Sequence, residues 1–245
     1  MIPDNSAVTE RSAKVCAHRG ASGTHPENTA AAYDEAVRVG ADMIEFDVRR
    51  SRDGQFVVMH DPAVDRTTNG SGMISDLSSD DIRRLDAGSG QQVPTLGEAF
   101  AYSEHAILNV HAHPQTDEDG DSMSDAFVEL FATRQAYDRG FVTSKDVRML
   151  RRIRALDERI RLCCLLRQRD PDYVQRVLDE IRCDVLQPSN KIVTPQLVAD
   201  AHDHGLKINP FYADEEDEMR RLIECGVDGI LTNFPALLVQ VLEAG

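Results

Sequence analysis

Several features are scarce in this chain, and each scarcity argues against a class of protein. Lysine and arginine number 27 against 42 acidic residues, and the net charge of −15 argues against a large nucleic-acid-binding face. No apolar run approaches the roughly 18 residues that a membrane span needs. The polar N-terminus, residues 1–13, also lacks the apolar centre of a signal peptide. We therefore expect a cytoplasmic protein with no nucleic-acid partner and no stable membrane insertion.

Cysteine is also sparse, and its spacing argues against a zinc-finger type of site. The chain has five cysteines and no C-x-x-C pair; they are Cys16, Cys163, Cys164, Cys183 and Cys225. Because three of them lie inside apolar, strand-like runs, we expect reduced thiols packed in the core of a protein from a reducing compartment.

The chain does contain a regular alternation of short β-rich runs and longer amphipathic runs. The expected strands cover residues 14–18, 42–48, 106–111, 140–143, 160–165, 184–187, 206–209 and 228–231. The expected helices cover 28–39, 95–103, 122–138, 144–156, 170–181, 194–204, 214–225 and 235–242, with Thr95, Ser144 and Thr194 as N-caps and Gly140 among the helix stops. Eight such units in 245 residues predict an α/β fold of the (β/α)8 TIM barrel type. A doubly wound open sheet is the alternative, since alternation alone does not close a barrel.

The second unit is interrupted by a loop-rich insertion at about residues 51–93. The segment opens with a hairpin turn at Ser51–Gly54 and a further strand at Gln55–His60, and it continues with Asn-Gly and Gly-Ser-Gly turns. We expect one TIM barrel domain over residues 1–245, with this insertion as a small subdomain at one end of the barrel.

Polar side chains gather where the first strands end, which is the active face of a barrel. His18 and Arg19 end the first strand, and His60 ends the hairpin strand. Glu45 and Asp47 share one face of the second strand, among apolar neighbours, and two buried carboxylates need a cation or a proton. Two histidines for proton transfer, an arginine for an anion and two carboxylates for a metal suit the cleavage of a phosphate ester.

An acidic run at Asp117–Asp121 has its glycine too early for an EF-hand loop, and we interpret it as a solvated loop.

At this point the chain resembles the glycerophosphodiester phosphodiesterase family. The shared words are the A-H-R-G of residues 17–20, P-E-N-T of 26–29, G-A-D-M-I-E-F-D-V of 40–48, V-V-M-H-D of 57–61, R-T-T-N-G-S-G of 66–72, V-P-T-L-G-E-A of 93–99 and G-V-D-G-I-L-T-N-F-P of 226–235. The resemblance implies a TIM barrel with an inserted subdomain, a divalent cation such as Mg²⁺ or Ca²⁺, and hydrolysis of a glycerophosphodiester to glycerol 3-phosphate and an alcohol. It implies that His18 and His60 are the acid–base pair, that Arg19 binds phosphate, and that Glu45 and Asp47 bind metal.

The chain departs from this family at the third barrel strand and near its C-terminal end. A glutamate and a lysine are typical where this chain has His111 and His113, so His111 is expected as a metal ligand and His113 on the phosphate side. An imidazole ligand makes Mn²⁺ or Zn²⁺ more suitable. Arg167 and Lys191 are candidates for the lost lysine charge, although surface positions are expected for both. The family's tryptophan near the seventh strand is missing, and Phe211 is expected to form the same apolar wall of the substrate site; Asn233 stands where an aspartate is common.

Three functions remain open from the sequence. The favoured one is a metal-dependent phosphodiesterase that acts on a small phosphodiester. The second is a lyase or transferase that releases a cyclic phosphate, and the third is an inactive relative that binds an anion. A homo-oligomer is possible on this evidence, and the released alcohol is not predicted.

Overall fold

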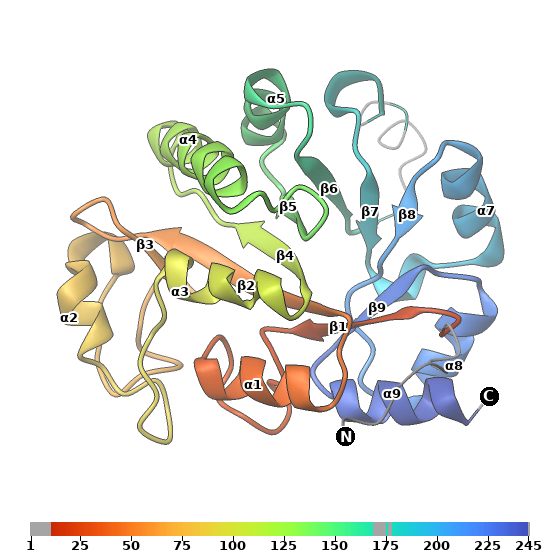
Figure 1. Ribbon diagram of the computed structural model, residues 1–245, viewed down its shortest axis with the longest axis horizontal. Helices are drawn as coiled ribbons and strands as arrows, with labels where there is room; N and C mark the ends of the chain where they lie inside the picture. Colours follow the sequence, from red (N-terminus) through yellow and green to blue (C-terminus); the bar gives the residue numbers. More distant parts are fainter. Residues whose placement is uncertain (1–10, 169–174, 176–177, 245) are drawn as a thin grey trace, which may run out of the picture.

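Eight parallel strands form the core of the fold. The computed structural model describes residues 11–168, 175 and 178–244 (Figure 1). Its parallel strands are β1 (Lys14–His18), β2 (Met43–Arg50), β4 (Ile107–Ala112), β5 (Gly140–Ser144), β6 (Arg161–Leu166), β7 (Val185–Pro188), β8 (Lys207–Ile208) and β9 (Gly229–Thr232). They lie in the order β8-β7-β6-β5-β4-β2-β1-β9, which brings the last strand beside the first.

The gap between β8 and β9 is bridged by single backbone hydrogen bonds. The N–H of Asp228 donates to the carbonyl of Ile208 (2.9 Å), and the N–H of Leu231 donates to the carbonyl of Pro210 (3.0 Å). On the side that faces β9, Ile208 donates its N–H to the Asp228 side chain and Pro210 has no N–H, so no regular ladder forms there. The strands therefore nearly close on themselves, which confirms the TIM barrel and excludes the open sheet.

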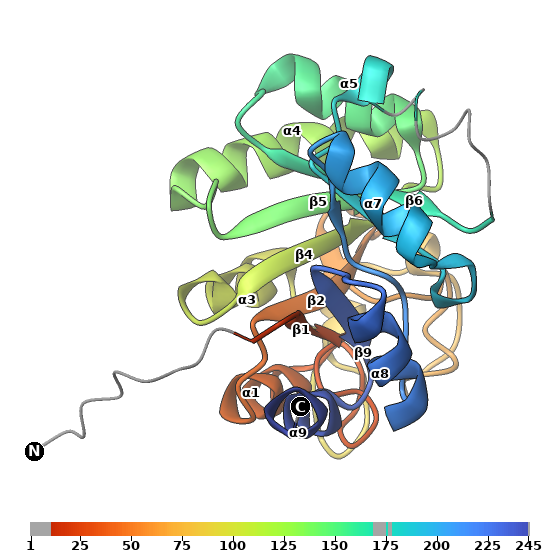
Figure 2. The same ribbon diagram turned by 90° about the vertical axis from the view of Figure 1, so that its right-hand side faces the viewer.

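The helices lie outside the strands and cover the core (Figure 2). They are α1 (Ala30–Arg38), α3 (Leu96–Phe100) followed by the 3₁₀ turn η2 (Ala101–Glu104), α4 (Asp117–Arg134), α5 (Val147–Leu156), η3 (Asn190–Ile192), α7 (Pro195–Asp203), α8 (Glu216–Glu224) and α9 (Pro235–Glu243). The predicted N-caps Thr95 and Thr194 are present, and Pro195 takes the first helical position. The helix predicted over 170–181 falls largely outside the described residues. Among those residues, no helix has both the length and the apolar composition to cross a membrane.

Two helices begin at other residues than the sequence predicts, because of their N-caps and nearby charges. The run Asp117–Asp121 is not a loop, because Thr116 caps α4 and the acidic side chains lie at the positive end of its dipole. Helix α5 begins after Asp146, whose carboxylate accepts from two backbone N–H groups, and Ser144 ends β5 instead. Gly140 begins β5 and does not end the preceding helix, which ends at Arg134 with Gln135 as a left-handed C-cap.

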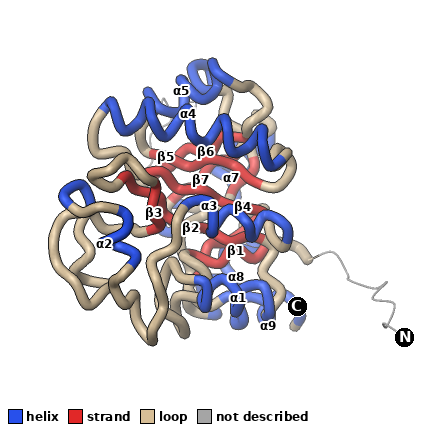
Figure 3. The backbone as a smooth tube through the Cα atoms, turned by 60° about the vertical axis from the view of Figure 1, so that its left-hand side comes forward, coloured by secondary structure: helices blue, strands red, loops and turns tan. Residues whose placement is uncertain are grey.

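The segment at 51–93 stands to one side of the barrel (Figure 3). It contains β3 (Phe56–Val58), which pairs antiparallel with β2, the 3₁₀ turn η1 (Ile74–Asp76) and the short helix α2 (Ser79–Arg83). Val57, Ile74 and Ile82 form a separate small apolar cluster inside it. The assignment of the whole chain, residues 1–245, to one domain stays a prediction.

The expectation of five reduced thiols is wrong for one pair. Cys164 on β6 and Cys183, just before β7, form a disulfide with a Cα–Cα distance of 6.6 Å. Cys16 and Cys163 are buried free thiols, as expected. The disulfide links β6 to the start of β7. A sequence separation of 19 residues does not by itself indicate that these two cysteines lie close together.

The turn after β1 requires a glycine, and this requirement gives a stability prediction. Gly20 has a φ of 78°, and a Cβ there would lie 2.7 Å from the backbone of Ala32. Gly90 has almost the same φ, 77°, but a Cβ there would meet nothing within 4 Å. We expect Gly90→Ala to cost about 1 kcal/mol of unfolding free energy. Gly20→Ala should cost at least about 3 kcal/mol, because the clash adds to the backbone strain. Urea unfolding of both variants tests this; equal losses would contradict the steric account.

Candidate active site

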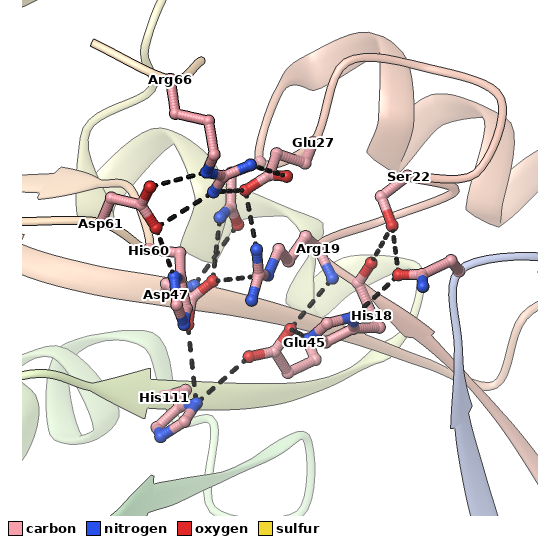
Figure 4. A network of polar contacts seen from close by, with 12 residues as sticks. His18, Arg19, Ser22, Glu27, Glu45, Asp47, His60, Asp61, Arg66 and His111 are labelled. Carbon is pink, nitrogen blue, oxygen red and sulfur yellow. Dashed lines mark hydrogen bonds and ion pairs between the residues drawn. The ribbon is translucent and has the colours of Figure 1, made fainter. Parts of the chain in front are cut away.

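The polar side chains expected from the sequence lie together at the carboxyl ends of β1, β2 and β4 (Figure 4). The sheet register places His18 beside Glu45 and Asp47 beside His111. His60, which follows β3, extends into the same group, as Figure 4 shows.

Two buried carboxylates form the centre of this site. Glu45 and Asp47 are each 1% exposed, which is unusual for ionised groups without compensation. The backbone N–H of Arg19 donates to Glu45 (2.9 Å), and the amide of Asn28 donates to Asp47 (3.0 Å). Burial opposes ionisation of Asp47. The hydrogen bond from His113 and the nearby groups His113, His111 and Arg19 together outweigh burial and hold the pKa of Asp47 well below its usual value.

Arg19 reaches the carboxylates from the left-handed turn before Gly20. Its Nη1 donates to Glu27 at 2.8 Å. Its Nε lies 3.2 Å from Asp47 Oδ2, yet the N–H does not point at that oxygen and this buried donor has no hydrogen-bond partner among the described residues. Arg19 therefore keeps donor capacity for a further anion.

The insertion contributes an arginine that fixes the rim of the site. Arg66 donates to Glu27 (2.8 and 2.7 Å) and to Asp61 (2.6 and 3.1 Å). These bonds from Arg66 lower the pKa of Asp61 well below its usual value, so Asp61 is ionised. Asp61 in turn accepts from Nδ1 of His60 at 2.7 Å, which leaves Nε2 of His60 free.

His18 is held by residues from the far end of the chain. Its Nδ1 lies 2.8 Å from Oδ1 of Asn233, whose amide nitrogen donates to Asp214 (2.6 Å). Since an amide oxygen can only accept, Nδ1 of His18 carries the proton and Nε2 faces Glu45, 4.0 Å away. Ser22 donates to the backbone carbonyl of His18 and also lies within hydrogen-bond distance of Asn233, both at 2.7 Å.

His111 and His113, at the end of β4, have different surroundings. Nδ1 of His111 lies 3.5 Å from both Glu45 and Asp47, and its Nε2 is buried without a partner among the described residues. Nε2 of His113 lies 2.6 Å from Asp47. Burial lowers the pKa of His113 to about 4 despite the attraction of Asp47, so the ring is neutral at pH 7.

These donors suit a divalent cation. Glu45, Asp47 and His111 each offer one ligand atom within 4.8 Å of the others. Glu45 and Asp47 are each 1% exposed, and Nδ1 of His111 lies 3.5 Å from both. A cation among these three atoms would balance the buried negative charge. Asp47, His60 and His113 meet the same distance criterion.

The remaining predicted residues do not gather at this centre. Phe211 is partly buried against an apolar cluster that includes Cys16 and Leu231. The aromatic side chain that lies on His18 is instead Tyr212, with ring centroids 5.0 Å apart. Arg167 and Lys191 are exposed and belong to the surface.

The sequence reasoning missed several residues of the site. Asp61 and Arg66 stand inside the quoted words V-V-M-H-D and R-T-T-N-G-S-G, which could have indicated them. Arg49, buried on β2 and donating from Nε to the carbonyl of His60 (2.7 Å), gave no local signal, nor did Asp214.

Known proteins resemble this chain over most of its length. The model of the glycerophosphoryl diester phosphodiesterase family matches residues 18–237. A glycerophosphodiester phosphodiesterase of Caldanaerobacter subterraneus subsp. tengcongensis is 31% identical over 94% of this chain and 98% of its own. One from Bacillus subtilis is 30% identical over 92% and 85%. The structure of an Oleispira antarctica phosphodiesterase in complex with the product sn-glycerol-3-phosphate has a TM-score of 0.86 and 27% identity, and covers 94% of this chain and 96% of that one.

The family model spans most of the chain, and the matching relatives align over nearly their full lengths. The chain therefore belongs to the glycerophosphoryl diester phosphodiesterase family, and the prediction of a phosphoric diester hydrolase is confirmed at that level.

Proposed function

We propose that the protein hydrolyses a small glycerophosphodiester to glycerol 3-phosphate and an alcohol, with a divalent cation held by Glu45, Asp47 and His111. The observation that carries this proposal is the convergence of His18, His60 and Arg19 around that buried donor set. The product named for the Oleispira antarctica structure supports glycerol 3-phosphate as the phosphate-bearing product.

Each side chain has a part that follows from its contacts. When bound, the cation supplies positive charge for the phosphoryl oxygens. Arg19 brings a fixed positive charge beside the same group, and its buried Nε–H has no partner among the described residues. His113 lies on the phosphate side as a neutral hydrogen-bonding group, and Phe211 remains the proposed apolar wall of the substrate site.

His18 and His60 are the proposed acid–base pair because both present a free Nε2. Asn233 anchors Nδ1 of His18, and Asp61 anchors Nδ1 of His60, so neither ring turns freely. One removes a proton from the attacking group and the other gives a proton to the departing alkoxide. If the substrate's neighbouring hydroxyl attacks first, a cyclic phosphate forms, and its persistence would mark a lyase.

The imidazole of His111 gives a prediction about metal choice. With a single imidazole in place of a carboxylate, we expect higher activity with Mn²⁺ than with Mg²⁺ or Ca²⁺. His111→Glu should reverse that order, because it adds an oxygen ligand and a negative charge. Initial rates of glycerol 3-phosphate release from metal-stripped protein, resupplied with each ion in turn, test both statements. The same order of ions for both proteins would contradict the assignment of His111 as a ligand.

We propose three further properties from the composition and the fold. A cytoplasmic location and the absence of a nucleic-acid partner rest on the composition and the net charge of −15. A homo-oligomer is compatible with the fold.

A further inference from the structure

We propose that Asp47, His60 and His113 form a second metal site, selective for a borderline cation such as Zn²⁺, and that its occupation stops turnover. The inhibitory part rests on the proposed function, because it requires His60 to transfer a proton; the binding part does not.

The three side chains already lie close enough to share one ion. Each offers a ligand atom within 4.8 Å of the other two, and Asp47 Oδ1 is 2.6 Å from His113 Nε2. The rings of His60 and His113 meet edge to face, with centroids 5.2 Å apart. They come from β2, the segment after β3 and the residue after β4, so the fold brings together donors that are far apart in the sequence.

The donor set distinguishes this site from the first one. Two imidazoles and one carboxylate are a common set for zinc with an open fourth position. Glu45, Asp47 and His111 offer two carboxylates and one imidazole, and are therefore the harder site. A borderline cation gains more from the second imidazole than Mg²⁺ does.

Asp61 supports His60 as a ligand. It accepts from Nδ1 of His60 at 2.7 Å and is itself held by Arg66 at 2.6 Å, so the ring is fixed with Nε2 outward. Metal-binding histidines usually have such a carboxylate behind them.

Asp47 belongs to both donor sets, so the binding of one ion affects the affinity of the protein for the other. Two cations on one carboxylate repel each other, so the second ion binds more weakly than the first. Once it is bound, Nε2 of His60 is no longer available as an acid or a base, and turnover stops although the first ion remains.

Zinc titration of the untagged full chain, after metal removal, tests the site without any activity assay. Calorimetry, with zinc counted by elemental analysis after gel filtration, should show two zinc ions per wild-type chain and one per chain of His113→Lys. Lysine places a cation where the imidazole was. His113→Asn, which keeps a hydrogen bond to Asp47, serves as a second variant in case lysine disturbs folding, and far-UV circular dichroism checks both. His105→Ala is the matched control, since His105 is exposed and lies outside both donor sets; it should bind as the wild type does.

The activity assay adds a second readout, with Mn²⁺ in the first site and Zn²⁺ added. The zinc concentration for half inhibition should rise at least about tenfold in His113→Lys. Removal of a residue that only supports a metal ligand already lowers metal affinity by that factor. Equal zinc stoichiometry in wild type, His113→Lys and His113→Asn would overturn the proposal. Loss of one zinc in both variants, together with no turnover by the wild type under any metal, would uphold the site and overturn the proposed function.

Discussion

His18→Ala and His60→Ala are each expected to lower kcat for glycerophosphodiester hydrolysis by about 10²–10⁴-fold, the usual contribution of a positioned acid or base. Each ring presents Nε2 to the site and is anchored through Nδ1, by Asn233 for His18 and by Asp61 for His60. Neither variant should lose the fold, because both rings are partly exposed at the mouth of the barrel. Steady-state rates with saturating metal, together with thermal unfolding, give the comparison.

A change of leaving group then assigns the two roles. A p-nitrophenolate leaving group needs no proton. On a p-nitrophenyl ester, the loss in kcat should therefore shrink for the variant that lacks the acid. The loss in kcat of the other variant should persist. His105→Ala controls for the removal of an exposed imidazole and should keep wild-type rates. Retention of full activity by either site variant would remove that histidine from the mechanism.

Asp47→Asn is expected to have an equally large effect, through the metal. Asp47 belongs to both donor sets and also accepts from Asn28 and His113. The amide keeps the shape and can still accept from His113, but it loses the negative charge that a hard cation prefers. We expect loss of at least about 10³-fold in kcat/KM, since a bound cation stabilises the transition state by several kcal/mol.

The defect of Asp47→Asn should appear in metal binding as well as in rate. Calorimetry with Mn²⁺ should show a much weaker first site in the variant. Asp34→Asn is the control, because Asp34 lies on an exposed face of α1 and bonds to Tyr102. Unchanged Mn²⁺ affinity in Asp47→Asn would show that the ion lies elsewhere.

The strands of the barrel were predictable because each buried run has a short, β-rich pattern, and β1 begins and ends as expected at Lys14 and His18. The closure of the barrel was harder to predict from the sequence, since it depends on hydrogen bonds such as that from Asp228 to Ile208. Helix α4 was placed too late because the acidic run at 117–121 was interpreted by its polarity alone. The N-cap Thr116 and the helix dipole account for the earlier start.

At the site, the alternation of Glu45 and Asp47 on one strand face was enough to predict that they lie together. The proximity of His111 followed from its position at the end of the next strand, and the register beside Asp47 agrees. The anchors of the two histidines could not be predicted in this way. Asn233 reaches His18 from 215 residues away and is itself held by Asp214. Arg66 reaches the site only because the insertion folds back over Glu27.

A ³¹P NMR time course tests the central claim most directly. Metal-stripped protein would be mixed with a glycerophosphodiester and then given Mg²⁺, Ca²⁺, Mn²⁺ or Zn²⁺, with His60→Ala run in parallel. We predict that a glycerol 3-phosphate signal grows only when metal is present and is nearly absent in His60→Ala. A cyclic phosphate that accumulates and persists, or an unchanged diester signal under every ion, would contradict hydrolysis by this site.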